Sequence, residues 1–107
     1  VGLLYQARRQ FLVERLESRL ADFGCLYSNA LGTHVSFRLN DAFPDKEVVR
    51  ELAQRGVVAR ACSDFDGDFS VNGLMLGFGT FSETEIDDAV AIIEDVLRTR
   101  FASKMTG

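Results

Sequence analysis

The sequence predicts an α+β fold, a two-layer α/β sandwich in which a small, mostly antiparallel sheet is covered by helices on one face. Two observations carry this prediction. Strand-like segments cluster between amphipathic helical segments, in the order α-β-β-α-β-β-α. Near the C-terminus, a short apolar run at residues 73–78 leads within a few residues into a long helical stripe. Together they indicate one sheet with one layer of helices.

The first helix is predicted over residues 3–22, where leucines recur every four residues and charged side chains fill the opposite side. Gly24 ends that pattern. A short strand is expected at residues 25–28. Residues 33–39 then alternate apolar and polar side chains, which predicts a half-buried strand.

Pro44 cannot continue a strand but suits the start of a helix, so the second helix is predicted over residues 45–55. Gly56 is expected to end it as a C-cap. Residues 57–62 are predicted to form the next strand, followed by an acidic turn at residues 64–68.

The last strand and helix have the clearest local signal. The run at residues 73–78 is apolar, and a helix is predicted over residues 83–100. Ser82 and Glu85 have the spacing of a capping box, in which the hydroxyl and the carboxylate satisfy backbone N–H groups at the helix start.

Composition bounds the function. The 107 residues suit one domain over residues 1–107, and the net charge of -4 argues against direct nucleic-acid binding by this chain. No run is long enough to cross a bilayer and no secretory signal is present, so the expected location is cytoplasmic. Cys25 and Cys62 are expected to be buried, reduced thiols.

The residues alone predict no catalytic, metal-binding or cofactor-binding residue. His34 is the only histidine, and nothing around it in the sequence supports a catalytic triad. The acidic turn at residues 64–68 lacks the later glycine and glutamate of a calcium loop. No glycine-rich phosphate-binding motif occurs. These observations describe an α/β domain without an active site of its own.

Five short motifs add a resemblance. In chain order they are Tyr5-x-x-Arg8-Arg9-x-x-Leu12, Gly32-Thr33-His34-Val35, Arg55-Gly56-Val57, Cys62-Ser63-x-Phe65, and Leu74-Met75-Leu76-Gly77-Phe78 before the capping box. This series resembles the small domain of fold type I pyridoxal-phosphate proteins. It is most similar to the aminotransferase-like half of the MocR branch of the GntR transcription regulators.

The resemblance implies that the chain is a fragment of a larger protein. It would be the C-terminal subdomain, which senses an effector and closes the cofactor pocket. The parent would bind pyridoxal phosphate in a large domain, bind DNA through an N-terminal winged helix, form a homodimer and take a small amino-acid-like effector. The resemblance places no cofactor in this chain and implies no contact with a membrane.

The resemblance also implies ligand-facing residues. Aminotransferases of this fold carry an arginine at the position of Met75, where it binds the substrate carboxylate. Arg60 on the preceding strand is the nearest substitute. Some relatives place an arginine at the position of Asp64, next to Ser63. The expected substrate-binding residues are therefore Arg60, Ser63 and Asp64.

Three functions stay open at this point. The first is the effector-sensing subdomain of a MocR-type regulator, and the second is the small domain of a class I/II aminotransferase. The third is a stand-alone α/β module for ligand binding or dimerisation. Whether the parent is an enzyme is not decided by these residues, and the isolated chain is not expected to be catalytic.

Overall fold

The computed structural model describes residues 2–27, 34–64, 71–77 and 81–100. Its elements follow the chain in the order α1 (Gly2–Arg19), β1 (Gly24–Tyr27), β2 (His34–Leu39), α2 (Asp45–Gln54), β3 (Arg60–Ala61), the 3-10 turn η1 (Cys62–Asp64), β4 (Gly73–Gly77) and α3 (Glu83–Arg100). Every predicted helix and strand has a counterpart, with differences at their ends.

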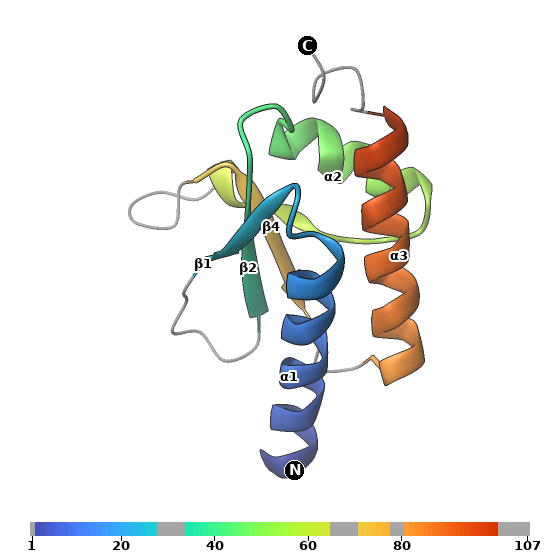
Figure 1. The fold of residues 1–107 in the computed structure, drawn as a ribbon. Coiled ribbons are helices and arrows are strands. Elements are labelled where there is room, and N and C mark those ends of the chain that lie inside the picture. The colour runs from blue at the N-terminus through green and yellow to red at the C-terminus, as the bar shows by residue number, and fades with distance from the viewer. Residues whose placement is uncertain (1, 28–33, 65–70, 78–80, 101–107) are drawn as a thin grey trace.

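The strands form one sheet in the order β1-β2-β4-β3 (Figure 1), and each neighbouring pair is antiparallel. β2 pairs with β1 on one side and with β4 on the other. The short β3 pairs with the free edge of β4, where Arg60 lies opposite Met75. Directly opposed residues point to the same face of a sheet, so this register assigns each side chain to one of two faces.

All three helices pack against one face of the sheet, which confirms the predicted two-layer architecture (Figure 1). The core between the layers is almost wholly aliphatic and aromatic. Its strand members are Val35, Phe37, Leu39, Leu74 and Leu76, its helix members include Leu12, Leu16, Val48, Leu52, Ile86, Val90, Ile93 and Leu97, and Leu20 joins it from just after α1. Burial of such side chains away from water is the main stabilising term of a domain of this size.

The first and last helices pack against each other (Figure 1). Ion pairs lie along their contact: Arg15 Nε is 3.2 Å from the Asp87 carboxylate, and Arg19 Nε is 3.3 Å from that of Glu94. Exposed pairs of this kind contribute little each, so the buried leucine and valine side chains dominate the contact. No helix in the described part of the chain is long and apolar enough to cross a membrane.

The largest departure from prediction concerns residues 57–62, of which only Arg60 and Ala61 pair as a strand. After α2, Gly56 adopts φ +83°, and Val57 N–H donates to Leu52 O at 2.9 Å. This hydrogen bond keeps Val57 at the end of α2, so the strand does not begin there. The segment then turns into η1 after Ala61. The first helix is also shorter than predicted and ends at Arg19.

No described helix covers the opposite face of the sheet, here called the helix-free face. The register assigns to it the side chains of Cys25, Tyr27, Ser36, Arg38, Arg60 and Met75, together with Gly73. Its centre is nevertheless buried, because Ser36 and Met75 are 1% and 8% exposed. Arg38 and Arg60 flank that centre and are exposed.

Candidate functional site

The three predicted ligand-binding residues lie close together in sequence but in different surroundings. Arg60 is exposed on the helix-free face, directly opposite Met75. Ser63 is half-buried in η1. Asp64 is exposed, and its carboxylate lies 3.4 Å from Lys46 Nζ on α2. The structure therefore leaves Arg60 available to a ligand, whereas Ser63 and Asp64 already have partners within the domain.

The partner of Ser63 is Asp45, a buried carboxylate at the start of α2 that is only 4% exposed. Ser63 Oγ donates to Asp45 Oδ1 at 2.7 Å, and Ser63 N–H donates to Oδ2 at 2.9 Å. Gly73 N–H, at the start of β4, donates to the same Oδ2 at 3.1 Å. One carboxylate thus joins α2, η1 and β4.

Asn72 completes this buried polar cluster from the other side. Its Oδ1 accepts a hydrogen bond from Asp45 N–H at 2.9 Å. Its Nδ2 donates to Phe43 O at 2.9 Å and to Asn40 O at 3.1 Å, which fixes the turn between β2 and α2. Sequence reasoning missed both residues, since Asp45 was expected only to begin a helix. Their partners are 18 to 33 positions away along the chain, which no local pattern indicates.

Cys62 lies beside this cluster and is 1% exposed. Burial raises the pKa of its thiol, the nearby Asp45 charge adds to that rise, and a hydrogen bond with Ser36 opposes it. The thiol is therefore protonated at neutral pH and is a poor nucleophile. The prediction that both cysteines are buried is correct for Cys62 and wrong for Cys25, which is exposed on β1. Cys25 lies on the helix-free face of an edge strand, where no described helix covers it.

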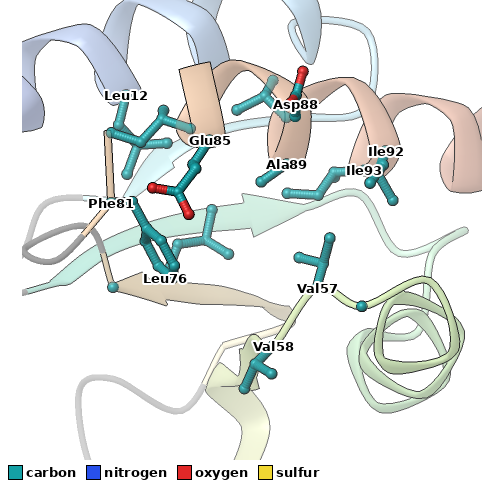
Figure 2. A pocket seen from close by; sticks show the side chains of 14 residues that line it. Leu12, Val57, Val58, Leu76, Phe81, Glu85, Asp88, Ala89, Ile92 and Ile93 are labelled. Atoms are coloured by element: carbon teal, nitrogen blue, oxygen red, sulfur yellow. The ribbon is translucent and has the colours of Figure 1, made fainter. Parts of the chain in front are cut away.

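An apolar groove lies on the other side of the domain, between the first half of α3 and residues 56–58 (Figure 2). Figure 2 shows Ala89, Ile92 and Ile93 of α3 on one side and Val57 and Val58 on the other. The groove has a volume of about 260 Å³. Val58 and Phe81 at its rim are 87% and 45% exposed.

Two acidic residues, Glu85 and Asp88, line the groove, and no described basic residue does. Glu85 belongs to the predicted capping box, which the structure confirms: Ser82 N–H donates to Glu85 Oε1 at 3.0 Å, and Glu85 N–H donates to Ser82 Oγ at 3.1 Å. Hydrogen bonding of the Glu85 carboxylate to the Ser82 backbone N–H, and after it to the Ser82 side chain, lowers the pKa of Glu85. The groove was not predicted, although the adjacent apolar pair at residues 57–58 is a weak signal for it.

The remaining sequence candidates add no chemistry that the structure can place. His34 begins β2, but its side chain lies outside the described residues, as does most of the acidic turn at residues 64–68. Within the described residues, no cluster of histidine, cysteine, aspartate and glutamate could hold a metal ion.

No protein-family model matches this sequence, and no curated protein matches it. Solved structures do match the fold. An archaeal alanine:glyoxylate aminotransferase is similar over 91% of this chain, with a TM-score of 0.77 and 25% sequence identity. An ornithine aminotransferase from Plasmodium yoelii is similar over 88%, with a TM-score of 0.67 and 13% identity.

The chain spans 24% of the length of each of these two aminotransferases. Both neighbours support the broader resemblance, whereas the finer one to the MocR branch is not shown by them. The conclusion from fold and comparison together is that this chain is an aminotransferase-like α+β domain.

Proposed function

We propose that this chain is the small domain of a pyridoxal-phosphate-dependent, aminotransferase-like protein and that it supplies one wall of the ligand pocket. The observation that carries the proposal is the similarity over 91% of the chain to an aminotransferase of which the chain spans 24%. A domain that makes up about a quarter of such a protein would act together with the rest of the polypeptide.

The described residues do not fit a cofactor-holding role by themselves. Lys46 is exposed on α2 and paired with Asp64, in a setting that offers no enclosed site for a cofactor. Lys104 lies outside the described residues. In this proposal the cofactor belongs to the remainder of the parent protein, and this domain contributes binding groups and excludes water when it closes on the pocket.

The wall itself would comprise Arg60, Ser63 and Asp64. Arg60 offers an exposed guanidinium that suits a carboxylate. Ser63 would shape the wall rather than donate to the ligand, because its hydroxyl already donates to Asp45. Asp64 would reach the ligand from its exposed ion pair with Lys46. The ligand would be a small amino-acid-like molecule.

A second candidate is a regulator of the MocR type, with a winged-helix DNA-binding domain and a homodimeric arrangement. Met75 favours it, because aminotransferases of this fold carry a carboxylate-binding arginine at that position. Arg60 faces the same side of the sheet from the neighbouring strand. A sensor that only binds its ligand needs less exact placement of that arginine than an enzyme does.

The test uses the intact protein expressed from its complete reading frame. We expect pyridoxal phosphate to remain bound through gel filtration and the visible absorption of that cofactor to change when amino acids are added. Release of a keto acid would identify an aminotransferase. A shift of promoter DNA without keto-acid release would identify a regulator. An intact protein that does not retain the cofactor would refute the proposal.

A matched pair of variants tests the wall. Asp64 and Asp95 are both exposed and each is paired with an exposed cation, Lys46 and Arg55 respectively. Asp64→Asn should change the affinity for amino acids in the titration, whereas Asp95→Asn should leave it unchanged. Equal effects of the two substitutions would remove Asp64 from the site.

A further inference from the structure

The helix-free face of the sheet holds two exposed arginines in a defined arrangement. Arg38 on β2 lies opposite Gly73 of β4, and Arg60 on β3 lies opposite Met75 of β4. Gly73 and Met75 are two positions apart on one strand, so all four residues share this face. The two arginines therefore lie on opposite sides of β4.

Strand geometry sets the spacing between them. With neighbouring strands about 4.8 Å apart and about 3.3 Å of rise per residue, the two arginine Cα atoms lie roughly 12 Å apart. Residue 73, opposite Arg38, adds no side chain to this face and has to be glycine. A Cβ there would approach Phe37 O to 2.5 Å.

Arginines in the helical layer and on the helix-free face differ in whether they form ion pairs. In the helical layer, Arg15, Arg19, Arg55 and Arg98 each lie within 3.3 Å of a carboxylate oxygen. Within the described residues, Arg38 and Arg60 have no ion-pair or hydrogen-bond partner. Arg50, on the outer surface of α2, likewise has none there, so an unpaired arginine alone is no site. What distinguishes Arg38 and Arg60 is that two such groups share one face around a glycine.

We propose that Arg38 and Arg60 form a binding site for a small dicarboxylate on the helix-free face. A planar guanidinium binds both oxygens of one carboxylate through a pair of parallel hydrogen bonds. Two guanidinium groups on separate strands therefore call for two carboxylates on one ligand. The inference rests on the proposed function in taking Arg60 as ligand-facing, and it adds Arg38 and the chemical class of the ligand.

Within the described residues, the nearby negative charges do not oppose such a ligand strongly. Asp64 is compensated by Lys46 at 3.4 Å. Asp45 is buried and directs both carboxylate oxygens at Ser63 and Gly73. Among the side chains that the structure describes, the outward ones of β1 and β2 other than Arg38 are Cys25, Tyr27 and Ser36, none of which is a carboxylate.

The experiment is a calorimetric titration of the intact protein at constant ionic strength with two probes of equal length. Glutarate has two carboxylates, and its monoamide, glutaramate, has one. We expect glutarate to bind at least tenfold more tightly than glutaramate. Arg38→Gln and Arg60→Gln should each reduce glutarate affinity about tenfold, to the level of glutaramate. Arg50→Gln, an exposed arginine in the other layer, should change neither affinity.

Equal affinity for the two probes, or glutarate affinity that survives both substitutions, would overturn the site. An equal loss in Arg50→Gln would show that only net charge matters and would overturn it as well. The titration is run with and without added pyridoxal phosphate. Arginine-dependent glutarate binding in a protein that does not retain the cofactor would uphold this site and refute the proposed function, so the two failures are distinguishable.

Discussion

The helices α2 and α3 both begin with acidic side chains but use them in different ways. At the start of α3, Ser82 and Glu85 exchange hydrogen bonds with each other's backbone on the protein surface. At the start of α2, the cap residue Pro44 makes no side-chain hydrogen bond, and Asp45 directs its carboxylate to η1 and β4. The hydrogen bonds at the start of α3 join residues close in sequence, whereas those at the start of α2 join separate elements of the fold.

This difference teaches what a helix start can do. The capping box of α3 satisfies backbone donors that the helix itself exposes, so it stabilises that helix alone. The Asp45 carboxylate also gains from the N-terminal end of the α2 dipole, but it satisfies donors of two other segments. Removing it should loosen the attachment between elements, whereas removing the cap should fray one helix end.

The largest expected effect comes from Asp45→Ala. It would leave the backbone N–H groups of Ser63 and Gly73 without acceptors in a buried region, at about 1–3 kcal/mol each. We expect a loss of about 2–6 kcal/mol in the free energy of unfolding, measured by urea denaturation. Glu83→Ala, in the exposed first turn of α3, is the control and should stay within about 0.5 kcal/mol. Similar losses in both variants would erase the contrast between the two helix starts.

An intermediate effect is expected for Ser82→Ala, which removes the cap of α3 at a cost of about 0.5–2 kcal/mol. The cost should depend on pH. The folded-state pKa of Glu85 lies below its usual 4.5, so the stabilisation from this group is present above that value and is lost as the pH falls through the folded-state pKa. Ser82→Ala keeps the backbone N–H that donates to Glu85 and loses only the contribution of the side chain, so the denaturation midpoints of wild type and variant should come closer in acid without meeting.

The neighbouring exposed substitution Thr84→Ala serves as the control for the cap. It should show no such pH dependence relative to wild type. A Ser82→Ala penalty that is constant from neutral to acid pH would mean that the Ser82 side chain does not help to stabilise the ionised Glu85 carboxylate.

The smallest effect is expected for Asp95→Asn, which tests whether a carboxylate that joins two elements must also be buried to stabilise the fold strongly. Asp95 also joins two elements, since its carboxylate accepts from Arg55 Nη1 at 3.0 Å, but this pair is exposed. Asp95→Asn should cost under about 1 kcal/mol, because water and salt screen an exposed pair. The cost should disappear in molar salt in the same urea experiment. A cost comparable to that of Asp45→Ala would mean that bridging matters more than burial.

The same distinction explains what could be predicted from the sequence. The three helices, the four strand positions, the capping box and the Gly56 helix end all depend on residues within a few positions of each other, and each was predicted. The predicted strand 57–62 was wrong in extent because its limits depend on contacts outside the segment, including that of Ser63 with Asp45. The two-sided burial of β4 likewise depends on what the whole chain places around it.

The candidate site was predicted less completely than the fold. Arg60 was singled out by its place before the motif at residues 62–65, and the structure shows it opposite Met75. Arg38, which the proposal above adds, was not singled out because alternation assigns it only to the outer face of a strand. Its relation to Arg60 exists only through the register of β4 with both neighbours. Such register is set by the packing of the whole sheet rather than by local residue preference.

The packing of α1 on α3 has a consequence for the order of events during synthesis. The apolar stripe of α1, with Leu16 at its centre, is covered in part by α3, whose Val90 is made about 70 residues later. At about 5–20 residues per second, a ribosome takes roughly 4–14 s to cover that distance. Throughout this interval the part of the stripe that α3 covers lacks its native partner, and it gains that partner only when the last helix has left the exit tunnel. Before α3 is made, a chaperone or another apolar segment of the same chain would cover that part of the α1 stripe.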